Sequence, residues 1–354
     1  MKLIVTGGGT GGHVFPALET ANYARSQGWD VEYFGSHRGQ EGEASAALDI
    51  AFKGFPSEPL YSLRTLRGLK GAMRLLKAVV QVMPALKASH PTAVFATGGY
   101  SSAPILHAAR KLKIPTVLHE QNSVPGRTIL ISSKWAHCVC TVFHASSARF
   151  PGASVVRTGM PVRECFRLAS TSNIGQILVV GGSQGSAALN DVALATAIHS
   201  QSKGASWLHI TGKAHFESVQ ASSLKLGMNG RYRLAPYLSG DKMATAMSQS
   251  TVVVARSGAG TIAELAVVGV PGVFVPFPTS FGDHQTANAR EIESLGGGSV
   301  VPQAELTVDG LENAIMSWTH DSDRLAAASR ALAQWDVPDA TQRIMAMIDD
   351  AVKK

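Results

Sequence analysis

The fold is decided by Lys2-Leu3-Ile4-Val5-Thr6-Gly7-Gly8-Gly9-Thr10-Gly11-Gly12-His13, an apolar run that breaks into a glycine-rich turn. The second half of the chain repeats this arrangement at Ile177-Leu178-Val179-Val180-Gly181-Gly182-Ser183-Gln184-Gly185-Ser186. Each stretch is typical of a buried parallel strand that leads through a turn into a helix. The N–H groups of such a turn and the helix N-terminus can bind a phosphate or diphosphate. Two copies predict two similar domains that face each other across a cleft.

The order of the expected elements agrees with two domains. The 354 residues are enough for two α/β domains. Strands are expected over 3–6, 31–34, 93–97, 116–119, 138–142, 177–180, 207–211, 232–235, 252–255 and 272–275. Helices are expected over 16–27, 71–89, 103–111, 186–199, 241–248, 261–268 and 286–295, with more from about 329 onward. This alternation predicts parallel sheets with right-handed crossovers, and ligands beyond the carboxyl ends of the strands.

Composition narrows the classes of function. The net charge of +7 favours anionic partners. No apolar run approaches the roughly 20 residues of a membrane-spanning helix. Cys138, Cys140 and Cys165 have no metal-ligand spacing and are typical of reduced thiols in a cytosolic protein. Residues 60–94 contain no Asp or Glu, yet they contain six basic residues: Arg64, Arg67, Lys70, Arg74, Lys77 and Lys87.

The first glycine turn also fits GxGxxG, the dinucleotide fingerprint of dehydrogenases. A dehydrogenase would have an acidic residue at the end of its second strand, to hold the ribose. Here that strand ends Phe34-Gly35-Ser36, and Glu32 lies inside it. The sequence therefore disfavours a dehydrogenase.

Two further polar clusters follow expected strands in the second half. Arg256-Ser257-Gly258-Ala259-Gly260-Thr261-Ile262-Ala263-Glu264 opens a helix whose N–H groups could bind an anion. Glu264 could cap that helix, or it could hold two adjacent ribose hydroxyls. In Asp283-His284-Gln285-Thr286-Ala287-Asn288, Asp283 is expected to be an N-cap. Gln285 and Asn288 share a helix face and suit sugar hydroxyls, with a solvated first turn as the alternative.

Two other polar clusters favour different roles. His119-Glu120-Gln121-Asn122 lies at the carboxyl end of an expected strand, which favours a functional role. Asp321-Ser322-Asp323 resembles the DxD metal motif of another glycosyltransferase class. It precedes an expected helix over 324–334 and follows no apolar strand, which indicates helix capping.

Together these stretches resemble the MurG family, which transfers N-acetylglucosamine to lipid I in peptidoglycan synthesis. The matching motifs run in the family's order over nearly the whole chain: Gly8 to Pro16, Gly98-Gly99-Tyr100, His119 to Asn122, Pro161-Val162-Arg163, Gly181 to Gly185, Arg256 to Ala259 and Asp283-His284-Gln285. Two positions depart from the family pattern, where Met160 replaces the usual Asn and Gly260 an often-found Leu.

The resemblance implies a GT-B glycosyltransferase fold, with two Rossmann-like parallel-sheet domains facing a cleft. It implies an N-terminal domain over 1–158 for lipid I and the membrane, a C-terminal domain over 163–337 for UDP-N-acetylglucosamine, and a final helix over 338–354 that packs back on the first domain. No cofactor is expected. For the donor it implies Ser183, Arg163 and the helix start from Ala259 through Thr261 to Ala263 at the diphosphate, Glu264 at the ribose, Gln285 and Asn288 at the sugar, and Leu238 at the uracil.

For the acceptor side, the resemblance implies that Thr10, Gly11, Gly12, His13 and Asn122 face lipid I. The reaction would be inverting: the C4 hydroxyl of the N-acetylmuramoyl unit attacks the anomeric carbon, giving lipid II and UDP. A hydroxyl needs a base, and His13 is the first candidate because an imidazole titrates near neutrality. Glu120 and His119 are the next candidates.

Lipid I stays in the bilayer, so the enzyme is expected at the cytoplasmic face of the cell membrane as a peripheral protein. Leu66, Leu69, Met73, Leu76 and Val80 recur at helical spacing beside Arg67, Lys70, Arg74 and Lys77, which is typical of a helix on an anionic leaflet. The alternative is a core helix with a solvated basic face. Other functions stay open: a related GT-B transferase, a nucleotide-sugar epimerase, or a nucleotide-sugar-binding protein without catalysis. Nucleic-acid binding is disfavoured, because the basic stretch has almost no aromatic residues for stacking.

Overall fold

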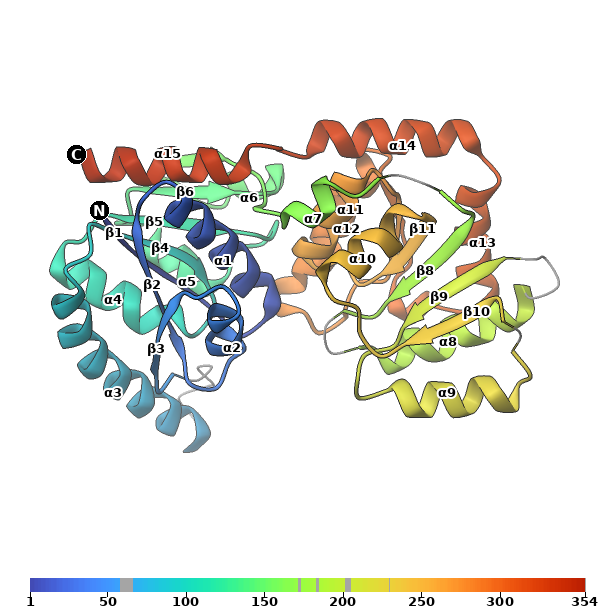
Figure 1. Ribbon diagram of the computed structural model, residues 1–354, viewed down its shortest axis with the longest axis horizontal. Coiled ribbons are helices and arrows are strands. Elements are labelled where there is room, and N and C mark those ends of the chain that lie inside the picture. The colour runs from blue at the N-terminus through green and yellow to red at the C-terminus, as the bar shows by residue number, and fades with distance from the viewer. Residues whose placement is uncertain (58–65, 171–172, 183–184, 201–204, 229, 354) are drawn as a thin grey trace. The chain divides into compact units, whose positions relative to one another are not determined.

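The chain folds into two compact α/β units (Figure 1). The computed structural model describes residues 1–57, 66–170, 173–182, 185–200, 205–228 and 230–353, without the side chains of 66–70 and 72. Unit 1 comprises Met1–Pro161 and Val337–Lys354, and unit 2 comprises Val162–Asp336. The chain thus leaves unit 1 after Pro161 and returns at Val337, close to the boundaries expected from the sequence.

Unit 1 is built on a seven-stranded parallel sheet in the order β3-β2-β1-β4-β5-β6-β7. The strand order reverses between β1 and β4, which marks the place where such sheets bind ligands. Its strands are β1 (Lys2–Gly7), β2 (Asp30–Ser36), β3 (Ala51–Phe55), β4 (Ala93–Gly98), β5 (Thr116–Glu120), β6 (Cys138–Thr141) and β7 (Val155–Arg157).

Helices cover both faces of this sheet. Its helices are α1 (Gly11–Ser26), α2 (Glu41–Ala46), α3 (Leu66–Ser89), α4 (Ser102–Leu112), α5 (Arg127–Ser132), α6 (His144–Ser147) and α15 (Ala340–Lys353). Alternation along β1 explains the layers: Leu3 and Val5 pack with α1 and α15, and Ile4 packs with α3 and α4 on the other face. The last helix, α15, therefore belongs to unit 1 and packs on α1, β4 and β5 (Figure 1).

Unit 2 has a six-stranded parallel sheet in the order β10-β9-β8-β11-β12-β13. Here the order reverses between β8 and β11. Its strands are β8 (Gln176–Val180), β9 (Ser206–Ile210), β10 (Tyr232–Ala235), β11 (Ser250–Ala255), β12 (Gly272–Phe274) and β13 (Gly298–Val300). Its helices are α7 (Glu164–Arg167), α8 (Ala187–His199), α9 (Phe216–Lys225), α10 (Gly240–Ser248), α11 (Ala259–Val268), α12 (His284–Ser294), α13 (Val308–Thr319) and α14 (Ser322–Trp335), with short 3-10 turns at Phe281–Asp283 and Gln303–Glu305.

Among the described elements, three edge strands (β3, β7 and β13) and six helices (α2, α5, α6, α7, α9 and α13) were not expected from the sequence. Several helices also begin earlier than expected, and the difference is five residues for α1, which begins at Gly11, and for α3, which begins at Leu66. Because α1 begins at Gly11 rather than Pro16, His13 lies in its first turn. In the described part of the chain, none of the helices combines the length and apolar character needed to span a membrane.

Candidate active site

The first glycine turn lies at the carboxyl edge of the unit 1 sheet, where β1 and β4 are neighbours. The turns after these two strands meet, since the N–H of Gly8 donates to the carbonyl of Gly98 at 3.2 Å. Gly99 has a φ of 81°, and a Cβ there would lie 1.9 Å from the carbonyl oxygen of Gly8. A Cβ at Gly8 would in turn lie 1.7 Å from the buried carboxyl of Glu41. Only glycine allows these close approaches.

His13 is held at this edge through its Nδ1 atom. That nitrogen lies 2.7 Å from Oε1 of Gln121 and 2.9 Å from the carbonyl oxygen of Thr97. The hydroxyl of Thr97 also donates to the carbonyl of His13 at 2.7 Å. The end of β4 and the residue after β5 therefore fix the imidazole together. Thr10 is the N-cap of α1 and is exposed, and its side chain makes no capping bond.

His119 is buried inside unit 1, whereas a catalytic candidate is expected to be accessible to the substrate. Its side chain is fully buried, Nε2 bonds to the carbonyl of Gly159 at 3.0 Å, and Nδ1 accepts from Gln121 at 2.9 Å. Burial lowers the pKa of His119 to about 4, which keeps the ring neutral near pH 7. Both ring nitrogens of His119 are bonded inside the protein, so its contacts are those of a supporting residue and favour His13 over it as the base.

Glu120 is also buried, and it organises the loop that carries Asn122. Its Oε1 accepts from the N–H of Asn122 at 2.9 Å and from the Asn122 side-chain amide at 3.3 Å, and its Oε2 accepts from the N–H of Gly126 at 2.8 Å. Burial raises the pKa of Glu120 to about 7, and these N–H donors oppose that rise. Its carboxylate oxygens bond to its own loop, which makes Glu120 a support for the half-buried Asn122.

The second glycine turn follows β8 at the reversal of the unit 2 sheet. Ser183 and Gln184 lie outside the described residues. Ser186 is the N-cap of α8, and its hydroxyl accepts from the N–H of Leu189. The same hydroxyl accepts from Nη2 of Arg256 at 2.6 Å. The turn after β8 is therefore tied directly to the turn after β11.

Arg256 is buried, and its hydrogen bonds hold several loops together at this edge of the sheet. Besides Ser186, its guanidinium donates to the carbonyls of Val275 and Pro276 and to the side-chain oxygen of Gln303, at 2.6 to 3.0 Å. All four acceptors are neutral oxygens. A buried cation bonded only to neutral groups gives this edge a positive field. The N-terminus of α11, capped by Gly258 without a side-chain bond, adds to it.

Glu264 pairs with Arg163. The Arg163 Nη2 lies 2.7 Å from the Glu264 Oε1, and both side chains are mostly buried. Burial raises the pKa of Glu264, and the charge of Arg163 opposes that rise. The expectation that Glu264 could cap α11 is wrong, because the helix begins at Ala259 and no acidic residue lies in its first turn. Gly240 lies against Arg163 and links this pair to the loop of the half-buried Leu238.

Three polar side chains at the start of α12 make different kinds of contact. Asn288 is fully buried and its amide donates to the carbonyl of Ser257 at 3.2 Å, so it anchors the turn after β11. Gln285 is half-buried and its Oε1 accepts from the N–H of Phe277, so this turn is not simply solvated. Asp283 is at the N-cap with a φ of 55° and bonds the hydroxyl of Thr286 rather than a helix N–H. In contrast, the side chain of Asp321 accepts from the N–H of Arg324, which confirms helix capping there.

The sequence assigned no individual role to Thr97 or Gln121. It also did not predict that the hydrogen bonds of Arg256 would hold several loops of unit 2 together. The polar run His119–Asn122 was the available signal for Gln121, while the partners of Arg256 are spread from residue 186 to residue 303. In the described residues no group of three or more His, Cys, Asp and Glu side chains could hold a metal ion.

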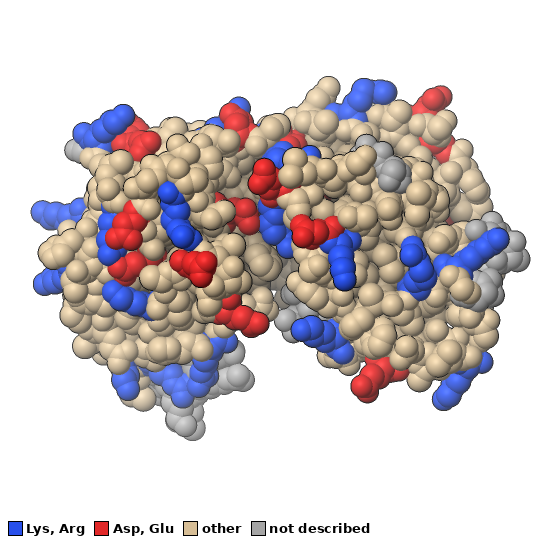
Figure 2. All heavy atoms as spheres, in the orientation of Figure 1, with Lys and Arg blue, Asp and Glu red and all other residues tan. Residues whose placement is uncertain are grey.

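A basic surface lies on α3. Met73, Leu76 and Val80 are 65%, 66% and 65% exposed, and Arg74 and Lys77 beside them are exposed as well. The core side of α3 is formed by Ala78, Val82 and Leu86, so the residues from Met73 to Val80 on the other face are not core residues. The side chains of Arg67 and Lys70 lie outside the described part. Figure 2 shows Lys and Arg gathered over this end of unit 1.

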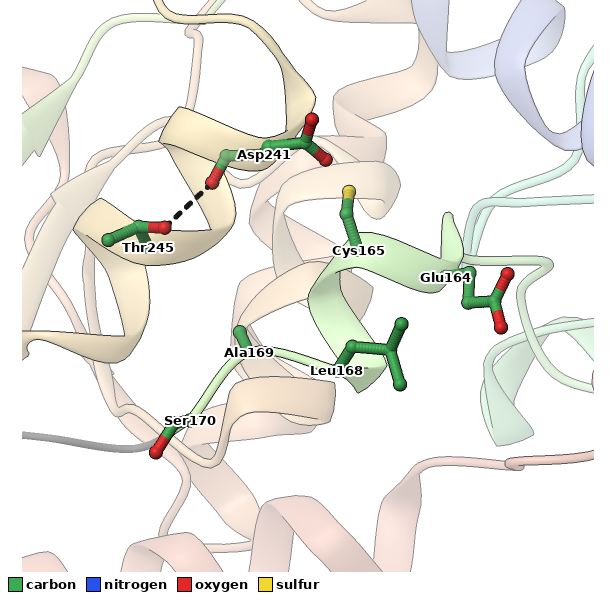
Figure 3. A pocket seen from close by; sticks show the side chains of 7 residues that line it. All are labelled: Glu164, Cys165, Leu168, Ala169, Ser170, Asp241 and Thr245. Carbon is green, nitrogen blue, oxygen red and sulfur yellow. Dashed lines mark hydrogen bonds between the residues drawn. The ribbon is translucent and has the colours of Figure 1, made fainter.

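One pocket of about 500 Å³ lies in unit 2, between α7 and α10 (Figure 3). The hydroxyl of Thr245 donates to the carbonyl of Asp241 in its wall. The pocket contains none of the residues expected to bind a substrate; it is lined by Glu164, Cys165, Leu168, Ala169, Ser170, Asp241 and Thr245.

Comparisons with known proteins agree with this architecture. Residues 3–141 match the glycosyltransferase family 28 N-terminal domain, and residues 176–344 match the glycosyltransferase family 28 C-terminal domain. A UDP-N-acetylglucosamine–N-acetylmuramyl-(pentapeptide) pyrophosphoryl-undecaprenol N-acetylglucosamine transferase of Bacillus pumilus is 34% identical, over 97% of each chain. The protein of the same name from an Exiguobacterium species is 35% identical, over 100% of each chain.

Solved structures agree as well. The crystal structure of Acinetobacter baumannii MurG has a TM-score of 0.79 and 30% identity, over 99% of each chain. A calicheamicin glycosyltransferase, CalG4, shares the fold with a TM-score of 0.72 at 14% identity, over 100% of this chain and 98% of the other. The two Rossmann-like sheets and these matches confirm the GT-B fold expected from the sequence. The chain belongs to the MurG family of glycosyltransferase family 28.

Proposed function

We propose that this protein transfers N-acetylglucosamine from UDP-N-acetylglucosamine to the C4 hydroxyl of the N-acetylmuramoyl unit of lipid I, forming lipid II for peptidoglycan synthesis. The observation that carries the proposal is the positive edge of unit 2, where Arg256 ties the turns after β8 and β11 together. A dianionic diphosphate is the ligand such an edge favours. The names of the relatives supply the sugar and the acceptor.

In unit 2, the donor diphosphate lies at the N-termini of α8 and α11, with Ser183 and residues 259–263 around it. Arg163 and Glu264 act as a pair, in which the carboxylate accepts from the ribose hydroxyls and the guanidinium approaches the diphosphate. Gln285 contacts the sugar and the backbone near Leu238 contacts the uracil. The leaving UDP gains negative charge, which Arg256 and the helix N-termini stabilise without a cofactor. An unchanged rate after dialysis against EDTA tests that last point.

In unit 1, the turn from Thr10 to Gly12 and the side chain of Asn122 hold the acceptor, and His13 takes the proton of its C4 hydroxyl. The oxygen then forms the bond to the anomeric carbon as the bond to UDP breaks, so the configuration inverts from α to β. His13→Ala is expected to lower kcat by about a hundredfold or more, with donor affinity nearly intact. A variant that keeps most of its turnover would eliminate His13 as the base.

The linkage of the product tests the reaction class. With UDP-N-acetylglucosamine and a lipid I analogue, NMR of the product is expected to show a β-1,4-linked disaccharide. A nucleotide-sugar epimerase would convert the donor without any acceptor, and a binding protein would leave both compounds unchanged. Either result would overturn the proposal.

We propose also that α3 docks on the anionic cytoplasmic face of the cell membrane, as expected of a peripheral enzyme whose acceptor stays in the bilayer. The exposed stripe of Met73, Leu76 and Val80 beside Arg74 and Lys77 supports this, because apolar and basic groups together favour an anionic leaflet. Each cation near the surface contributes about 1 kcal/mol.

Reversing Arg67, Lys70 and Arg74 to Glu is expected to abolish sedimentation with anionic vesicles, while activity on a short-chain soluble acceptor survives. Reversing three exposed basic residues elsewhere, Lys225, Arg330 and Arg343, is the control for net charge. Undiminished vesicle binding by the α3 variant would place the docking surface elsewhere.

A further inference from the structure

A chain of hydrogen bonds connects four groups of unit 1, from a backbone carbonyl near Pro161 to the ring of His13. It begins at the carbonyl of Gly159, two residues before Pro161, and passes through the His119 ring and the Gln121 amide. His119 and Gln121 are both almost fully buried. Backbone carbonyl oxygens can only accept hydrogen bonds, so they show which atom is the donor at each step of this chain.

The first assignment is His119. The carbonyl oxygen of Gly159 accepts only, so Nε2 of His119 carries the ring proton in their 3.0 Å bond. Since the buried ring is neutral, its Nδ1 has no proton and must accept. The donor 2.9 Å away is Nε2 of Gln121.

The second assignment is the Gln121 amide. Its Nε2 also lies 2.9 Å from the backbone carbonyl of His119, a contact that only an N–H can make favourably. Both amide hydrogens are thereby used, and the amide oxygen must face His13. Nδ1 of His13 lies 2.7 Å from that oxygen and 2.9 Å from the carbonyl of Thr97. Two acceptors face this nitrogen, so it carries a proton.

We propose that Gln121, oriented by His119, is a positioning residue that holds neutral His13 in the tautomer with its proton on Nδ1. The lone pair is then on Nε2, which is the atom that takes the proton of the acceptor hydroxyl. This inference rests on the proposed role of His13 as the base. The wrong tautomer of a catalytic histidine presents an N–H where the substrate needs a base.

The charged and titratable groups around the start of α1 leave this assignment unchanged. Tyr33 of β2 donates to the carbonyl of Gly7, and Glu41 of α2 lies behind Gly8. Lys2 of β1 pairs with Asp30 and Glu32 at the other end of the strand. The amide of Gln121, whose Oε1 lies 2.7 Å from Nδ1 of His13, can turn either its donor or its acceptor toward the ring.

The test is ¹⁵N NMR of the protein with labelled histidine, above the pH at which His13 is charged. The expected spectrum of the wild type shows a protonated Nδ1 and an unprotonated Nε2 for His13, identified by the signals lost in His13→Ala. An unprotonated Nδ1 would overturn the proposal. The tautomer of His13 is measured without turnover, so the result is independent of whether His13 is the base.

Three variants separate positioning from packing. Gln121→Leu removes the acceptor 2.7 Å from Nδ1 and leaves the Thr97 carbonyl 2.9 Å away, so the Nδ1 proton has one of these two acceptors left. A measurable population of the Nε2-protonated tautomer is expected beside the Nδ1-protonated one, with kcat lowered about tenfold because the ring loses one of its anchors, and with the KM for the donor unchanged. In Gln121→Glu an acceptor is kept, and so is the His13 tautomer. Gln220→Leu, on the exposed face of α9, is the control and should change neither reading. An unchanged His13 tautomer in Gln121→Leu would remove the role of Gln121.

Discussion

Removing the carboxylate of Glu264 should weaken UDP binding. In Glu264→Ala the ribose loses a charged acceptor and Arg163 loses its partner at 2.7 Å. Both side chains are largely shielded, at 19% and 25% exposure, so solvent replaces this interaction poorly. A hydrogen bond to a charged group contributes about 1.5–3 kcal/mol, which corresponds to roughly a 10- to 150-fold loss of affinity.

Isothermal titration calorimetry with UDP measures this directly. The matched control is Asp336→Ala, which breaks the similarly shielded pair with Arg167. We expect the control to lower stability and leave UDP affinity unchanged. A double-mutant cycle with Arg163→Ala then separates two roles: additive losses mean that Glu264 binds ribose itself, and strongly non-additive losses mean that it orients Arg163. An unchanged Kd for UDP in Glu264→Ala would refute the assignment of the donor site.

Two further predictions concern stability. Gly99→Ala should cost about 1–3 kcal/mol more than Gly152→Ala, because both glycines have a positive φ but only the Cβ at Gly99 meets the carbonyl of Gly8; urea unfolding measures the difference, and equal costs would contradict it. Burial lowers the pKa of His209 to about 4, so the unfolded chain binds a proton that the folded protein does not, and its contribution to stability is lost as the pH falls from 6.5 toward 4. His209→Gln should flatten this acid loss by up to about 1.4 kcal/mol per pH unit, and an equally steep loss would exclude His209 as its source.

The central strands could be predicted from the sequence because they are continuous apolar runs buried on both faces. Three of the four edge strands could not: β3 contains Lys53 and Gly54, and β7 and β13 have three residues each, so none of them gives a strong apolar signal. The sequence placed the start of this first helix, α1, at Pro16, beyond the glycine turn. The helix instead begins in the glycine turn, where the meeting of β1 and β4 fixes the backbone.

The glycine turns of the site could be predicted because glycine is the residue without a Cβ, and the clustered glycines after each apolar run are evident in the sequence. The roles of individual polar side chains could not, because their partners are distant in sequence. Asn288 bonds Ser257, and Arg256 bonds groups from Ser186 to Gln303, so helix-face spacing alone could not reveal these contacts. Similarly, nothing local to residues 119–122 shows that Gly159 accepts from His119.

The central claim is tested most directly by the release of UDP from a panel of UDP-sugars, with and without a lipid I analogue. The account predicts that UDP is released from UDP-N-acetylglucosamine only when the acceptor is present, and that UDP-glucose and UDP-N-acetylgalactosamine give far less. Acceptor-independent release, or equal release from another UDP-sugar, would contradict it.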